Sequence, residues 1–253
     1  MKTRFLLVAA TGLTLSLIGA AQAAETKNIV IVHGAFADGS GWRKVSDILS
    51  AKGYHVSIVQ HPLTSLAEDV AATKRILALQ DGPAILVGHS YGGMVVSDAG
   101  NDSKVSGLVY VAAFQPDKGE SLIKLAESKP VVNMGPGGIK ATPDGYLYLD
   151  PKAFPAAFAA DLPKADAAFL AQSQVFAAQG AFKAEAGDPA WKSKPSWTVV
   201  ATEDHAINPD LQREMAKRAG SKIREVKGSH AVYASKPADV AALIIDAAKA
   251  TSK

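Results

Sequence analysis

Residues 84–93 read Ala84-Ile85-Leu86-Val87-Gly88-His89-Ser90-Tyr91-Gly92-Gly93, an apolar run that ends in Gly-x-Ser-x-Gly. The four apolar residues at its start are typical of a buried strand, and Met94-Val95-Val96 after it favours a helix. A strand that turns at once into a helix can hold a serine hydroxyl above a sheet edge. Glycines suit the two positions where so tight a bend leaves no room for a side chain. This stretch therefore predicts a sharply turned Ser90 at the edge of a sheet.

Five further apolar runs alternate with helix-like segments along the chain, an order typical of a parallel α/β sheet. Ser65-Leu66-Ala67-Glu68 has the form of a capping box, and Asn208-Pro209 has the form of a helix start. The expected fold class is α/β, with a mostly parallel sheet flanked by helices. The expected strands are Asn28–Val32, Tyr54–Val59, Ala84–Gly88, Gly107–Ala112, Trp197–Ala201 and Lys222–Lys227.

The alternation breaks between about residues 115 and 195, where prolines and glycines interrupt alanine-rich pieces dotted with phenylalanine. Alanine favours helix, and eighty residues are too many for a structureless loop inside a compact domain. We therefore expect a small helical cap inserted between two strands of the sheet. Its phenylalanines are expected to pack the cap, with a few of them lining a pocket.

The amino terminus has the composition of an export signal. Lys2 and Arg4 precede an apolar segment from Phe5 to about Ala20, and Ala21-Gln22-Ala23 follows it. This order is typical of a secretory signal peptide, whereas the apolar run is short for the alternative, an uncleaved membrane anchor. The sequence predicts a signal peptide over residues 1–23 and a periplasmic or secreted domain over residues 24–253.

The charge balance limits the classes of partner. The chain has 27 basic and 24 acidic residues, and loss of Lys2 and Arg4 leaves 25 basic residues and a net charge of +1. Such a surface disfavours nucleic acid as a partner and stable membrane association after cleavage. The chain has no cysteine, which excludes disulfides, a thiolate metal site and a cysteine nucleophile. Nothing in the sequence indicates the oligomeric state.

A serine hydroxyl becomes a nucleophile when a base takes its proton and a third group orients that base. His230 directly follows the last expected strand, and Asp204 follows the strand before it. The chain order Ser90, Asp204, His230 is the order expected of an α/β-hydrolase. His205 is the alternative base, and Glu203 and Asp117 are the alternative acids.

Attack on a carbonyl also needs donors for the oxyanion. The N–H of Tyr91, directly after the serine, is one expected donor. The other is expected from the loop after the first strand, where Gly34 allows close approach and the Ala35 N–H is preferred. Phe36 is the alternative donor and is expected to contact substrate.

The motifs of other chemistries are missing from the sequence. It contains no His-Glu-x-x-His, no Cys-x-x-Cys and no Gly-x-x-x-x-Gly-Lys phosphate loop. We expect no metal ion and no organic cofactor.

Four separated motifs resemble one family. They are Val32-His33-Gly34-Ala35-Phe36, Gly88-His89-Ser90-Tyr91-Gly92-Gly93, Ala112-Ala113-Phe114-Gln115-Pro116-Asp117 and Thr202-Glu203-Asp204. The chain resembles α/β-hydrolases of the branch with plant methyl esterases, hydroxynitrile lyases and related bacterial esterases. The resemblance implies a triad of Ser90, Asp204 and His230 and an oxyanion hole from Ala35 and Tyr91.

The branch's lyases carry a threonine on the loop after the first strand and a lysine directly after the base histidine. Here these positions read Gly34-Ala35 and Ala231. The resemblance therefore implies a serine esterase that cleaves small carboxylic esters through an acyl-enzyme. The alternatives are a lyase or perhydrolase on the same scaffold, or a ligand-binding protein with a vestigial triad.

Overall fold

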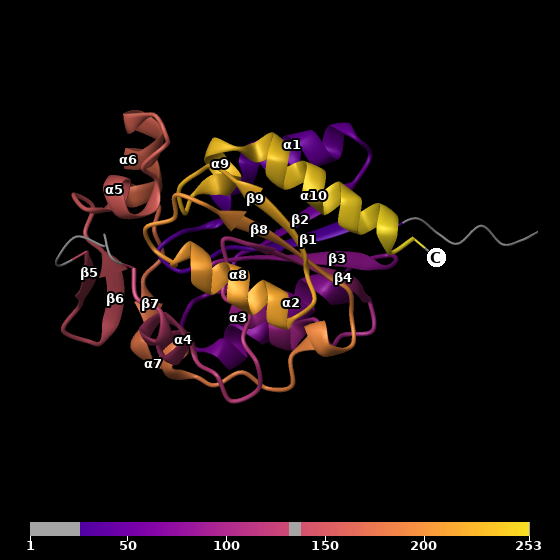
Figure 1. The fold of residues 1–253 in the computed structure, drawn as a ribbon, viewed down its shortest axis with the longest axis horizontal. Helices are drawn as coiled ribbons and strands as arrows, with labels where there is room; N and C mark the ends of the chain where they lie inside the picture. Colours follow the sequence, from indigo (N-terminus) through magenta and orange to yellow (C-terminus); the bar gives the residue numbers. More distant parts are fainter. Residues whose placement is uncertain (1–25, 132–137, 253) are drawn as a thin grey trace, which may run out of the picture.

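The computed structural model describes residues 26–131 and 138–252 (Figure 1). The expected signal peptide, residues 1–23, lies outside the described residues. In the described part of the chain, six parallel strands form one sheet in the order β2-β1-β3-β4-β8-β9. These strands are β1 (Asn28–Val32), β2 (His55–Val59), β3 (Ala84–His89), β4 (Val105–Val111), β8 (Ser196–Ala201) and β9 (Lys222–Val226). The six strands expected from the sequence are confirmed.

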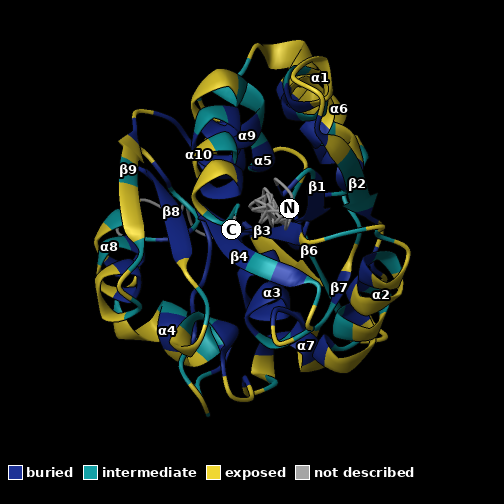
Figure 2. Cartoon of the chain, turned by 90° about the vertical axis from the view of Figure 1, so that its right-hand side faces the viewer, coloured by how far each residue is buried: buried dark blue, intermediate teal, exposed yellow. Residues whose placement is uncertain are grey.

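The central strands are apolar because both faces of the sheet are covered. Every residue of β1 and β3 is buried, as expected for strands with helices above and below them. In Figure 2 the buried strands run between two helical layers. Helices α1 (Arg43–Ala51), α9 (Val232–Ser235) and α10 (Pro237–Ala250) cover one face, and α2 (Leu66–Ala78), α3 (Gly92–Ala99) and α8 (Pro209–Arg218) cover the other.

Two helix starts follow from capping residues. Ser65 Oγ accepts a hydrogen bond from the Glu68 N–H at 3.2 Å and begins α2. Asn208 Oδ1 accepts from the Asp210 N–H at 2.9 Å, with Pro209 at the first position of α8. Such side chains satisfy N–H groups that have no partner within the helix. Both expected helix starts are confirmed.

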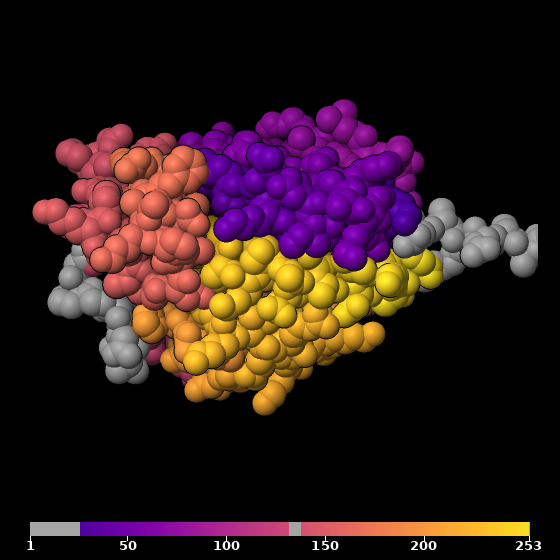
Figure 3. Space-filling view, turned by 90° about the horizontal axis from the view of Figure 1, so that it is seen from above, coloured from indigo at the N-terminus to yellow at the C-terminus, as the bar shows by residue number. Residues whose placement is uncertain are grey.

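The segment between β4 and β8 forms a cap at the end of the molecule where the parallel strands end (Figures 1 and 3). Its described residues contain the helices α4 (Leu122–Ser128), α5 (Phe154–Phe158), α6 (Lys164–Gln172) and α7 (Gln179–Lys183), with the 3₁₀ turn η2 (Ala190–Lys192) after them. The helical content agrees with the expectation from the alanine-rich sequence.

The cap also contains a small sheet that the sequence did not predict. Its strands β5 (Ile139–Ala141), β6 (Tyr146–Leu149) and β7 (Ala177–Ala178) pair antiparallel in the order β5-β6-β7. Strands of two to four residues are too short for a readable alternation of apolar and polar side chains. The purely helical description of the cap was therefore incomplete.

The register of the sheet places two loops side by side. Val32 at the end of β1 pairs with Gly88 near the end of β3. The loop after β1 and the turn after β3 therefore leave the sheet together, on the side that faces the cap.

The Thr26 N–H donates to Ser252 Oγ at 3.3 Å, so the ends of the described chain meet each other. Over the described residues, no helix has the length and apolar character needed to span a bilayer.

Candidate active site

Ser90 occupies the turn between β3 and α3. Its φ of +52° lies in the left-handed region, which residues other than glycine rarely adopt. A Cβ atom added at Gly88 would lie 2.6 Å from the Gly92 carbonyl oxygen, and one added at Gly92 would lie 2.6 Å from the Val32 carbonyl oxygen. The turn therefore requires glycine at both positions, and the expected strand–turn–helix setting of Ser90 is confirmed.

The structure brings three of the expected side chains together at this turn. Ser90 Oγ lies 2.9 Å from His230 Nε2, and His230 Nδ1 lies 2.8 Å from Asp204 Oδ2. A carboxylate only accepts, so Nδ1 carries the proton and Nε2 offers its lone pair to the serine hydroxyl. The exposed fractions are 8 % for Ser90, 1 % for His230 and 2 % for Asp204. This arrangement can move a proton from the hydroxyl to the imidazole.

The Asp204 carboxylate is held by a glutamine that the sequence analysis missed. Gln212 on α8 donates from Nε2 to Asp204 Oδ2 at 2.8 Å, and its Oε1 accepts from the Ala201 N–H at 3.1 Å. Asp204 Oδ1 accepts the N–H groups of Ala206 and Ile207 at 2.7 and 2.9 Å. The nearest sequence signal was the start of α8 directly after the acid, and nothing in it identifies Gln212 rather than another polar residue of that helix.

The alternative acids face other partners. Glu203 pairs with Lys227 at 3.5 Å, and its side chain is half exposed. Asp117 pairs with Lys192, and this contact holds the pKa of the Asp117 carboxyl below its usual range. The alternative base, His205, donates from Nδ1 to the Ala156 carbonyl at 3.2 Å. In the structure, Asp204 and His230 are therefore the acid and the imidazole beside Ser90.

The loop after β1 lies against the serine. A Cβ atom added at Gly34 would lie 2.7 Å from Ser90 Cβ, so residue 34 must be glycine for this approach. In the described chain, the N–H groups of Ala35 and Tyr91 donate to no protein acceptor. Both are thus free to bind an oxyanion at Ser90, and Tyr91 adds the positive end of α3. Among the described residues, the Phe36 N–H has no protein acceptor either, so it stays the alternative donor.

A small apolar pocket of about 110 Å³ opens at Ser90. Phe36 lies on its wall, where the sequence analysis expected it, and packs edge-to-face against Phe182 of the cap at 5.8 Å between ring centroids. Its other lining residues are Ala35, Tyr91, Phe114, Leu122, Ala126, Ile139, Leu149, Ala157, Phe158, Ala206, Ile207 and His230. The pocket suits an uncharged organic group next to the hydroxyl.

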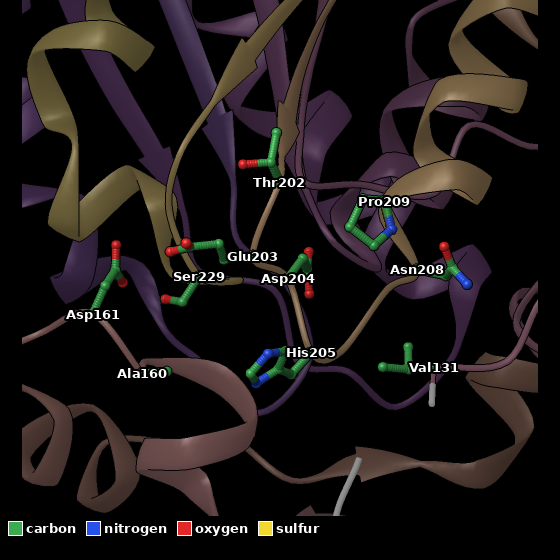
Figure 4. Close-up of a pocket in the computed structure, with 10 residues that line it drawn as sticks. All are labelled: Val131, Ala160, Asp161, Thr202, Glu203, Asp204, His205, Asn208, Pro209 and Ser229. Atoms are coloured by element: carbon green, nitrogen blue, oxygen red, sulfur yellow. The ribbon is translucent and has the colours of Figure 1, made fainter. Parts of the chain in front are cut away.

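A larger pocket of about 560 Å³ lies beside Asp204 and is shown in Figure 4. Asp161, Glu203 and His205 lie on its wall, whereas Ser90 belongs to the smaller pocket. The chemistry of Ser90 therefore belongs to the smaller, apolar pocket.

In the part of the chain that the structure describes, no three His, Cys, Asp or Glu side chains are grouped so that they could ligate one metal ion.

Comparisons with known proteins found sequences similar to this chain. A model of the alpha/beta hydrolase family matches residues 29–243. The chain is 34 % identical to a carbendazim hydrolyzing esterase of Nocardioides sp. over 114 residues, which cover 39 % of this chain and 46 % of that protein. It is 26 % identical to salicylic acid-binding protein 2 of Nicotiana tabacum over 263 residues, which cover 88 % of this chain and 98 % of that protein.

Solved structures show the same fold. A pyrethroid hydrolase from Sphingobium faniae JZ-2 superposes with a TM-score of 0.77 over 89 % of this chain and 98 % of that one, at 23 % identity. At this identity the likeness shows the arrangement of the sheet and helices. It confirms the fold class expected from the sequence.

Proposed function

The chain belongs to the alpha/beta hydrolase family, and from this premise we propose that it hydrolyses small carboxylic esters through an acyl-enzyme on Ser90. One observation carries the proposal: the continuous contact from Ser90 Oγ to His230 Nε2 at 2.9 Å and from His230 Nδ1 to Asp204 at 2.8 Å. It is supported by relatives that are named esterases and hydrolases.

The reaction proceeds in two steps that share one base. Ser90 Oγ attacks the ester carbonyl carbon while His230 Nε2 takes the hydroxyl proton. The carbon–oxygen bond to the alcohol then breaks, and His230 returns the proton to the leaving alkoxide. A water molecule repeats the attack on the acyl-enzyme, which releases the acid and restores Ser90. Asp204 holds the imidazole with its proton on Nδ1 throughout.

The pocket indicates which esters fit. Its lining is phenylalanine and aliphatic apart from the residues of the reacting centre. A charged acyl group would lose its hydration there and gain no opposite charge. The N–H groups of Ala35 and Tyr91, with Phe36 as the alternative to Ala35, receive the oxyanion.

Replacement of Ser90 tests the nucleophile. We expect Ser90→Ala to lower kcat on p-nitrophenyl acetate by about 10⁵–10⁶-fold, since the triad members act as a unit. A fluorophosphonate probe should add its phosphonyl mass to Ser90 of the unaltered chain. A loss below about tenfold in Ser90→Ala contradicts the proposal. Failure of the probe to label Ser90 would favour a ligand-binding protein with a vestigial triad.

We further propose that the protein is exported to the periplasm or beyond the cell. The support is the order of Lys2 and Arg4, the apolar segment and Ala21-Gln22-Ala23. Expression of the full chain in a Gram-negative host should give a mature protein whose first residue is Ala24, found by amino-terminal sequencing of the periplasmic fraction. An uncut chain in the cytosol would refute export.

A further inference from the structure

A buried polar cluster lies on the α2–α3 side of the nucleophile turn and takes no part in the proposed proton transfer. It consists of His33, His61, Asp69 and Tyr91, which we call the Asp69 cluster. Asp69 and Tyr91 are 0 % exposed, and His33 and His61 are at most 3 % exposed. Buried polar groups are costly unless they are paired, so such a cluster needs a compensating role.

Asp69 is the centre of this cluster. Its Oδ2 accepts the Tyr91 hydroxyl at 2.7 Å, and its Oδ1 accepts the Leu63 N–H at 2.9 Å. Its Oδ1 also lies 3.2 Å from His61 Nδ1, a close approach that makes no hydrogen bond. Burial and the nearby carboxylate raise the pKa of the Tyr91 hydroxyl, which therefore stays a neutral donor. Through Tyr91, Asp69 is tied to the residue directly after the nucleophile.

His61 lies beside Asp69 and contacts the loop after β1. Its Nε2 lies 2.9 Å from the His33 carbonyl oxygen, and because a carbonyl only accepts, Nε2 carries the proton. The two imidazole rings stack with 4.0 Å between centroids. His33 in turn donates from Nδ1 to the Gly34 carbonyl at 2.9 Å. Burial and His61 lower the pKa of His33 to about 3, so His33 stays neutral.

The two segments held in this way touch each other. A Cβ atom added at Gly92 would lie 2.7 Å from the His33 carbonyl oxygen, and one added at Gly34 would lie 2.7 Å from Ser90 Cβ. The segment with His33 and Gly34 leads into Ala35, and the turn from Ser90 to Gly92 contains Tyr91. The two preferred oxyanion donors thus come from adjoining segments that both contact the Asp69 cluster: Tyr91 donates to Asp69, and the His33 carbonyl accepts from His61.

We propose that Asp69 and the Tyr91 hydroxyl are positioning residues that hold the two oxyanion donors at a fixed separation. The proposal rests on the proposed function, because an oxyanion hole matters only if Ser90 attacks a carbonyl. Donors accelerate acyl transfer when they are already in place, and a displacement of about 1 Å can cost on the order of 10²-fold in rate.

Tyr91→Phe tests the proposal, because it removes one oxygen and keeps the ring. We expect kcat on p-nitrophenyl acetate to fall about tenfold with KM within about twofold, because the donors act on the transition state. Affinity for a trifluoromethyl ketone, whose adduct with Ser90 carries the oxyanion, should fall by a similar factor. We expect Tyr91→Phe to leave the rate of substrate binding unchanged.

Tyr110→Phe is the matched control. Tyr110 on β4 is also fully buried, and its hydroxyl lies 2.9 Å from Ser97 Oγ on α3. The same deletion there should lower the melting temperature and leave kcat and ketone affinity within about twofold of the unaltered chain. Equal loss of kcat in both variants would overturn the proposal, because the cause would then be a general loss of stability.

Asp69→Asn gives a second, independent test. The amide keeps the volume of the side chain and loses the charge, so kcat should fall with KM unchanged. If both residues act through one contact, the double variant Asp69→Asn/Tyr91→Phe should lose less than the product of the single losses. Losses that multiply fully, or a Tyr91→Phe enzyme with unaltered kcat and ketone affinity, would overturn the proposal. An unaltered chain without esterase activity or Ser90 labelling would instead refute the proposed function.

Discussion

At residue 34 the backbone lies so close to Ser90 that there is no room for a side chain. The Cβ atom of an alanine would meet Ser90 Cβ at 2.7 Å and His89 Nδ1 at 2.8 Å. His89 is fully buried, and its Nε2 donates to the His230 carbonyl at 3.0 Å. The histidine within the Gly-x-Ser-x-Gly motif thus points away from the Ser90 hydroxyl. It holds the backbone of His230, the imidazole beside Ser90.

The choice of acid is a residue-scale prediction. In Asp204→Asn the amide would donate to His230 Nδ1, which moves the imidazole proton to Nε2 and removes the acceptor for the Ser90 proton. We expect kcat to fall by about 10³–10⁴-fold, less than for Ser90→Ala.

Glu203→Gln is the control for that change, because Glu203 is the neighbouring acid and pairs with Lys227. Its kcat should stay within about twofold of the unaltered chain, since surface pairs contribute little. Steady-state kinetics on p-nitrophenyl acetate measure both. The reverse ranking would assign the acid to Glu203.

At the scale of elements, the parallel register decides which loops meet. Val32 at the end of β1 pairs with Gly88 of β3, and Val111 at the end of β4 pairs with His89 of β3. The β1 loop, the Ser90 turn and the Asp204 and His230 loops all follow strands whose carboxyl ends share one edge. A site at this edge is the general rule for open parallel sheets, because the strand ends bring distant loops together there.

The cap shows the limit of reasoning from local sequence. Its helices followed from alanine content, whereas β6 is only four residues, Tyr146–Leu149, and pairs with two neighbours that are shorter still. Such strands exist because their partners are present, since an isolated short strand has no stability of its own. The Asp69 cluster was missed for a similar reason: Asp69 lies in the first turn of α2, where an acidic residue is ordinary.

At the scale of the whole molecule, two buried neutral histidines make stability depend on pH. Burial lowers the pKa of His33 to about 3 and the pKa of His89 well below its usual 6.5. Below the unfolded pKa the unfolded chain binds both protons and the folded chain does not. The free energy of unfolding should therefore fall as pH decreases from about 6.5, with the contribution of His33 lost progressively toward pH 3.

Between about pH 6 and pH 5 each histidine lowers the free energy of unfolding by up to about 1.4 kcal/mol for each pH unit of acidification, so the two together approach about 2.8 kcal/mol per pH unit. Protonation of the carboxylates acts mainly near and below about pH 4.5. Urea unfolding at several pH values measures how steeply the free energy of unfolding changes with pH. His33→Gln should reduce this slope by about 1.4 kcal/mol per pH unit, the contribution of one proton. A free energy of unfolding that is constant from pH 7 to pH 5 would contradict this prediction.

The sequence alone determined the six strands, the glycine-flanked turn at Ser90 and the chain order of serine, acid and histidine. The strands and the turn depend on periodicity and on turn geometry within about ten residues, which a single sequence displays. The chain order is given directly by the positions of the three residues. Only the tertiary structure decided that Asp204 rather than Glu203 or Asp117 faces His230, that Gln212 holds it, and that Asp69 accepts the Tyr91 hydroxyl. Those contacts join residues from different strands and helices, and the direction in which a side chain points is set by the packing around it.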